Sequence, residues 1–170
     1  MDYDNTTLQD QFQVAVILRR KPSRNRWISH IWSVQGVVAN SQDVVTQTAG
    51  QPVHSGPDGS EDFLWGDISL RLYKDQAESY YHNLLAPEPA LYVILRTQQA
   101  QGPQPGAPYP VLVSASFDEA NAYVESDDDA QPVAMPGEIY HWVERFVLKH
   151  YVPERPTKRK RNNWKENGRG

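Results

Sequence analysis

Residues 12–18 place the strongest constraint on the fold. Their sequence, Phe-Gln-Val-Ala-Val-Ile-Leu, is apolar at nearly every position and rich in β-branched side chains. A continuous apolar run of this length is typical of a strand that is covered on both faces, whereas a half-exposed strand alternates apolar and polar residues. We therefore expect this segment to be a central strand of a sheet.

Other segments predict strands that pair locally. Residues 21–26 interrupt the apolar pattern with Pro and charge, and an aromatic, β-rich run follows at 27–34, which predicts a hairpin. Alternation over residues 67–73 predicts a further strand with one buried face. The short apolar runs 91–95 and 111–115 predict a second hairpin, while residues 40–62 have the composition of a surface loop.

Three helices are predicted. Asp75-Gln76-Ala77-Glu78 and Ser116-Phe117-Asp118-Glu119 both match a capping box, and a helix is expected to start at each. A third helix is expected from Pro136 to about Tyr151, and the acidic run 127–129 before it is interpreted as a solvated turn. Consecutive strands without helices between them favour antiparallel pairing. The predicted class is therefore α+β, with a mostly antiparallel sheet of about five strands packed by about three helices.

Charge divides the chain into a body and a tail. Residues 1–150 contain 10 Lys and Arg against 19 Asp and Glu, a net charge of −9, whereas residues 151–170 contain 7 against 2, a net charge of +5. Residues beyond about 152 also lack an apolar period. We expect a flexible N-terminus at 1–11, a single α+β domain at 12–152 and a disordered basic tail at 153–170.

Several kinds of chemistry have no support in the sequence. The chain has no cysteine, so disulfides, thiolate nucleophiles and thiolate metal sites are excluded. No glycine-rich phosphate loop follows a predicted strand, and the five histidines lack the spacing of metal ligands. No cofactor and no metal are predicted. The acidic N-terminus and the absence of a run of about 18 apolar residues predict a cytoplasmic protein without a membrane span.

His30 is the main candidate for an acid or base. Alternation along the strand 27–34 places it on the same face as Ile28, Trp32 and Val34. It is interpreted as a hydrogen-bonded core histidine, with a buried general base as the alternative. Ser116 is interpreted as a helix cap rather than a nucleophile, because the glycines of a nucleophile elbow are missing around Ser114.

Two segments combine positive charge with aromatic rings. In the first, Arg24, Arg26 and Trp27 at the hairpin tip precede His30 and Trp32, and guanidinium groups there can bind carboxylate or phosphate. The second is in the tail, where Lys158, Arg159, Lys160 and Arg161 are followed by Trp164. A solvated turn and a solubilising tail are the alternative interpretations.

Taken together in chain order, certain segments resemble a bacterial family of uncharacterised proteins that are commonly encoded beside molybdenum- or tungsten-dependent formate dehydrogenases. The matching segments are 26–32, 80–84, 92–96, 113–123, 133–136, 142–150 and 158–161. The resemblance implies an association with a formate dehydrogenase system and adds no catalytic residue.

Our leading hypothesis is a non-catalytic accessory protein for assembly or regulation. It would bind a protein partner in that system through the hairpin residues Arg24 to Trp32 and the basic tail. The first alternative is a weak nucleic-acid-binding protein that uses the tail, although the body charge of −9 would repel phosphate. The second is a small-molecule enzyme or binder centred on His30.

Overall fold

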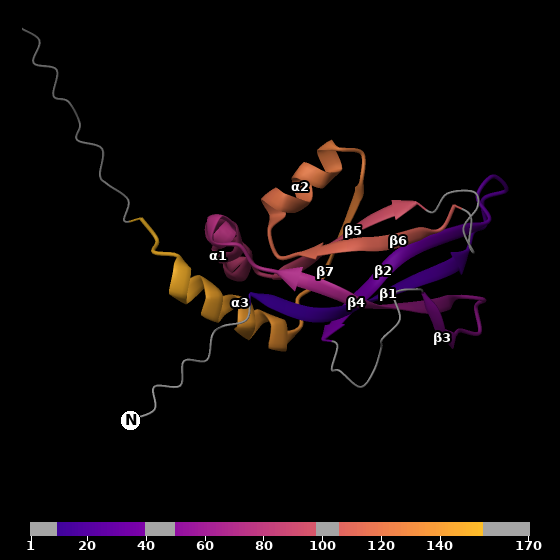
Figure 1. The fold of residues 1–170 in the computed structure, drawn as a ribbon. Helices are drawn as coiled ribbons and strands as arrows, with labels where there is room; N and C mark the ends of the chain where they lie inside the picture. The colour runs from indigo at the N-terminus through magenta and orange to yellow at the C-terminus, as the bar shows by residue number, and fades with distance from the viewer. Residues whose placement is uncertain (1–9, 40–49, 98–105, 155–170) are drawn as a thin grey trace, which may run out of the picture.

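The computed structural model describes residues 10–39, 50–97 and 106–154, and within them seven strands form two antiparallel sheets (Figure 1). The first sheet has the order β2-β1-β4-β3, and its strands are β1 (Gln11–Pro22), β2 (His30–Ala39), β3 (Gln51–Ser55) and β4 (Glu61–Arg71). The second has the order β6-β5-β7, with β5 (Ala90–Thr97), β6 (Pro108–Ser114) and β7 (Asp129–Ala134). The α+β class and the antiparallel pairing are confirmed, but the strands number seven and divide between two sheets.

β1 is the central strand that its sequence predicts. It pairs with β2 on one side and with β4 on the other. Val14, Ala15 and Val16 follow one another along β1 and are all almost fully buried, so both faces of its middle are covered. This accounts for the continuous apolar run in the sequence.

The two sheets pack together along two seams. At one seam β4 lies beside β6, where the rings of Trp65 and Tyr109 are 6.3 Å apart. At the other, β2 lies beside β7, and the backbone N–H of Val34 donates to the side-chain oxygen of Gln131 at 2.9 Å. Buried residues from both sheets and from two helices form one hydrophobic cluster, which includes Val16, Leu18, Leu70, Leu91, Val93, Val113, Tyr80, Val143 and Phe146.

The helices α1 (Ala77–Leu85), α2 (Phe117–Glu125) and α3 (Gly137–His150) gather at one end of the strands (Figure 1). The apolar stripe of α3 is buried as predicted, and its contacts include Phe146 against Tyr80 of α1 at 6.0 Å and Trp142 against Phe12 of β1 at 5.3 Å. Each fully buried side chain of this size stabilises the fold by about 1.5–3 kcal/mol. The tip of the β1–β2 hairpin lies at the opposite end of the molecule from these helices.

The start of α1 differs from the prediction. A 3₁₀ turn, η1 (Lys74–Gln76), precedes the helix, and Gln76 occupies the N-cap position without a side-chain hydrogen bond to the backbone. The Gln76 side chain instead accepts a hydrogen bond from the hydroxyl of Ser116 at 2.8 Å. The capping box predicted at Asp75 is therefore wrong, because tertiary contacts determine this helix start.

Two strands lie where loops or turns were expected. β3 is within the predicted surface loop 40–62, of which residues 40–49 lie outside the described residues. β7 begins at Asp129, the last residue of the predicted acidic turn. Both are short strands at sheet edges and both contain a proline, which an edge strand tolerates because one side of its backbone has no ladder to complete.

Candidate functional site

The tip of the β1–β2 hairpin is held by its own hydrogen bonds. The N–H of Ser23 donates to the carbonyl of Ser29 at 3.0 Å, and the N–H of Ile28 donates to the carbonyl of Asn25 at 3.2 Å. Side chains add two more bonds, because Ser23 Oγ accepts from the N–H of Asn25 and Asn25 Oδ1 accepts from the N–H of Trp27, each at 3.0 Å. Ser and Asn side chains commonly close turns in this way. Trp27 is thus presented on a defined turn.

Large apolar side chains at this tip face the solvent. Trp27 is 82% exposed, Ile28 is 52% exposed and Ile31, at the start of β2, is 56% exposed. Single exposed apolar residues are ordinary, whereas a group of them marks an interaction surface. The guanidinium carbon of Arg26 lies 5.1 Å from the centre of the Trp27 ring, within the range of a cation–π contact. We call Arg24, Arg26, Trp27, Ile28 and Ile31 the hairpin tip patch.

The basic residues of β1 that lead to the patch are already paired. Each faces a carboxylate on β4 or on the turn before it, in the pairs Arg19–Asp62, Arg20–Glu61 and Lys21–Asp58. The first is bidentate, with distances of 2.7 and 2.9 Å, and the hydrogen bond from Arg19 holds the pKa of the Asp62 carboxyl below its usual value. Among the described residues, Arg24 and Arg26 form no such ion pair. The cationic surface is therefore smaller than the sequence suggests, since only two of the five hairpin cations are available to a partner.

Trp32 supports the hairpin from below and is not part of the patch. Its half-buried ring packs 5.6 Å from Phe63, and the Arg20 guanidinium lies over both rings at 5.9 and 5.4 Å. The prediction that Trp32 binds a partner stays untested, while its position indicates a structural role.

The interpretations of His30 as a buried residue are both wrong. The strand starts at His30, opposite Pro22, and the side chain is exposed, with Ser29 Oγ 3.2 Å from Nδ1. The expected apolar face holds only from Trp32 onward, because Ile28 belongs to the turn. His30 therefore lies at the edge of the hairpin tip patch, in solvent.

The basic segment Lys158 to Arg161 and Trp164 lie outside the described residues. The structure therefore brings together only the hairpin half of the predicted binding residues. The three helices of the described ranges are all too short or too polar to cross a bilayer.

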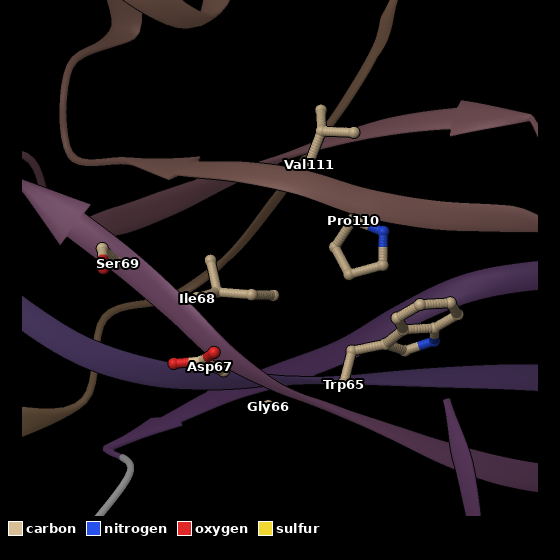
Figure 2. A pocket seen from close by; sticks show the side chains of 7 residues that line it. All are labelled: Trp65, Gly66, Asp67, Ile68, Ser69, Pro110 and Val111. Atoms are coloured by element: carbon tan, nitrogen blue, oxygen red, sulfur yellow. The ribbon is translucent and has the colours of Figure 1, made fainter. Parts of the chain in front are cut away.

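The described part of the chain has hollows that the sequence did not predict, and three of them are defined by their lining residues. One of about 310 Å³ lies between β4 and β6, where the Trp65 side chain points toward Pro110 (Figure 2). β4 carries one extra residue opposite Ala15 here, and Asp67 takes a positive φ of 57°. Of the residues that the structure describes, Asp67 is the only ionisable one lining this hollow, so they offer no acid–base pair there.

The other two hollows adjoin α2, with volumes of about 320 and 370 Å³. A buried polar network lies beneath them. The hydroxyl of Ser116 accepts from the N–H of Glu119 at 3.1 Å, which confirms Ser116 as the cap of α2. In a complete capping box the Glu119 carboxylate would accept a hydrogen bond from the backbone N–H of Ser116. Here that N–H donates to the hydroxyl of Ser114 instead, and the Ser114 hydroxyl donates to the Glu119 carboxylate.

None of the three hollows is lined by His30. Within the ranges that the structure describes, no three His, Asp or Glu side chains are grouped closely enough to hold a metal ion. We therefore take the hairpin tip patch as the candidate functional site.

Comparison with known proteins places the chain in a family without assigning it an activity. No curated protein and no solved structure gives a significant match. A family model described as a protein of unknown function (DUF3305) matches residues 13–161, which include all the strands and helices of the structure except the first two residues of β1. The chain therefore belongs to the DUF3305 family of proteins of unknown function.

Proposed function

We propose that this protein is a non-catalytic accessory factor that acts in the cytoplasm by binding a protein partner through the hairpin tip patch. The observation that carries the proposal is the exposure of Trp27 on a turn fixed by hydrogen bonds. A tryptophan is costly to leave in water, and it is among the residues that most often dominate binding energy at interfaces. A tip that is already ordered also loses little conformational entropy on binding.

The charge of the patch indicates the kind of surface it would meet. Arg24 and Arg26 are exposed cations beside apolar side chains, so a complementary surface would offer an apolar depression with carboxylates at its rim. The remaining cations of the hairpin are neutralised by β4 and its preceding turn, so they contribute little to such a contact.

We propose that the partner is a component of a bacterial formate dehydrogenase system, either the enzyme or a protein that assembles or regulates it. This part of the proposal comes from the family resemblance alone. The resemblance favours a protein partner over nucleic acid, and the body charge of −9 favours the same choice.

Site-specific crosslinking in native cells tests the proposal. A photoreactive amino acid at position 28 should crosslink to a subunit of the formate dehydrogenase system, and the same group at position 148 should not. Leu148 is the matched control because it is 77% exposed on α3, at the far end of the molecule.

Binding of the purified partner then measures the contribution of the patch. Trp27→Ala should weaken binding at least about tenfold, as expected for a hot-spot residue. The double variant Arg24→Glu and Arg26→Glu should slow association and reduce its salt dependence, and Leu148→Ala should change neither. Equal affinities for the wild type and Trp27→Ala would exclude the patch, and crosslinks to nucleic acid alone would exclude a protein partner.

A further inference from the structure

The two hollows beside α2 adjoin at Asp118, which lines both. One is bounded on its far side by α1 and β5, and the other by η1. Together we call them the acidic groove. Its acidic and aromatic lining residues are Asp75, Glu88, Asp118, Glu119, Tyr73, Tyr92 and Phe117, and His82 also lines it. The groove lies at the helical end of the molecule, away from the hairpin tip patch.

The carboxylates of the groove are not neutralised by the described residues. None of Asp75, Glu88, Asp118 and Glu119 forms an ion pair with a Lys, Arg or His of these ranges. Glu119 is fixed by the Ser114 hydroxyl, and the Ser116 cap fixes the helical turn that carries Asp118. Fixed carboxylates with low-dielectric walls focus a negative potential, so the groove favours a cationic ligand.

The aromatic residues of the groove favour the same ligand. Phe117 is 59% exposed at the groove's edge, and its ring meets that of Tyr92 in an edge-on contact at 5.9 Å. An exposed ring face beside carboxylates suits the ammonium of lysine and the guanidinium of arginine, which bind to both. An apolar molecule or a bare metal ion would use only one of these features.

We infer that the acidic groove binds the basic segment of the same chain, Lys158 to Arg161. The described chain ends at Glu154, three residues after Tyr151, whose ring packs 4.9 Å from that of Tyr81 on α1. Residues 155–170 contain 7 Lys and Arg and 1 Glu, so this segment is positively charged and complements the negative charge of the groove.

The connection is long enough for this contact. Tyr81 and the groove residues Ser79 and Asn83 lie on different sides of α1, so the chain has to pass around the helix. The path around half of a helix that is about 10–12 Å across with its side chains is about 16–19 Å. Seven residues from Glu154 to Arg161, the end of the basic segment, span up to about 25 Å when extended. A short tether also gives the segment an effective concentration in the millimolar range, which favours it over a similar segment of another protein.

This inference is independent of the proposed function, because it concerns the opposite end of the molecule. In this inference the basic segment is an internal ligand of the acidic groove. A partner that binds the basic segment would therefore have to displace the segment from the groove. The hairpin tip patch would remain available in either state.

The absence of cysteine makes the test direct. A single Asn163→Cys substitution in the full chain accepts a nitroxide spin label, which broadens the NMR signals of nearby amides. We expect selective broadening at Asp118, Glu119 and Ala122, with no effect at Trp27. The variant Asp75→Asn with Asp118→Asn should lower the ratio of docked to free segment roughly 2- to 30-fold, from the range measured for exposed ion pairs.

A matched control removes the same charge elsewhere. Asp67→Asn with Glu138→Gln changes two exposed carboxylates that do not line the groove, and broadening should persist in this variant. The amide spectrum of each variant reports directly whether it is folded. Uniform broadening, no broadening, or equal loss in both charge variants would overturn the inference. Broadening that appears only between spin-labelled and isotope-labelled molecules in a mixed sample would assign the groove to a second copy and would also overturn it.

Discussion

Asn83 is the polar residue whose loss should destabilise the fold most. It is buried on α1, and its side chain makes three hydrogen bonds to backbone groups. The amide Nδ2 donates to the carbonyls of Ala90 at 2.7 Å and Ala115 at 2.8 Å, and Oδ1 accepts from the N–H of Ala90 at 3.0 Å. One side chain thus joins α1 to the start of β5 and to the connection between β6 and α2.

Asn83→Ala removes all three bonds and leaves three backbone groups without their partner. At about 1 kcal/mol for each hydrogen bond, the free energy of unfolding should fall by about 3 kcal/mol. For a chain of this size, that corresponds to a decrease in Tm of about 6–12 °C. Urea denaturation followed by tryptophan fluorescence measures the change, and a lower midpoint with an unchanged m-value is the expected pattern.

Two further variants separate the hydrogen bonds from the loss of a side chain. Asn83→Asp keeps the shape but directs carboxylate oxygen at two carbonyls, so at neutral pH it should be at least as destabilising as Asn83→Ala, and part of the loss should be recovered as pH falls and the carboxyl is protonated. Asn121→Ala is the matched control, because exposed Asn121 bonds only Glu125 and should change stability by less than about 0.5 kcal/mol. Equal stabilities of Asn83→Ala and Asn121→Ala would refute the reasoning.

Three further perturbations follow from the polar contacts. Ser116→Ala removes the cap of α2 and the hydrogen bond to Gln76, and it should cost about 1–2 kcal/mol in urea denaturation. Asp62 has a pKa held below its ordinary value of 3.8 by Arg19, so its stabilisation is present above that value and is lost as pH falls through the lowered pKa. Asp62→Asn should therefore lessen the loss of stability on acidification, as measured by unfolding midpoints over a pH series. Burial raises the pKa of Tyr80 to about 12, so Tyr80→Phe should delete the most alkaline step of the ultraviolet tyrosine titration. The same change leaves the N–H of Tyr73 without its 3.0 Å bond to the phenol, so stability should fall by about 1–3 kcal/mol.

The parts of the fold that the sequence predicted are those whose apolar pattern is local. The run at 12–18 identified the central strand because burial on both faces leaves no polar position. The stripe of α3 identified a helix because its five buried residues recur at helical spacing. Both patterns depend only on which faces of the element are buried, and not on the identity of the elements that cover those faces.

The parts that were missed depend on distant partners. β7 is a strand because β5 offers it a ladder, and nothing in Asp-Ala-Gln-Pro-Val-Ala indicates that partner. The start of α1 is displaced because Gln76 binds Ser116, which lies 40 residues away. The charge of the hairpin was overestimated for the same reason, since Asp58, Glu61 and Asp62 come from outside it.

The segments that carry the family resemblance bear on how function should be sought. Many of their residues are buried: Tyr80 and Asn83 in α1, Val93 to Leu95 in β5, Val113 to Ser116 around the end of β6, and Trp142, Val143, Phe146 and Val147 in α3. Substitutions there change packing and hydrogen bonds, so a loss of activity in such variants would report unfolding rather than a site. For the exposed side chains of the hairpin tip patch we expect the opposite: a substitution should change partner binding and leave the stability of the fold nearly unchanged. Trp27→Ala removes a ring that is already 82% exposed, so stability should change by less than about 0.5 kcal/mol while partner binding weakens at least about tenfold. Only variants that separate binding from stability in this way can locate the function of this protein.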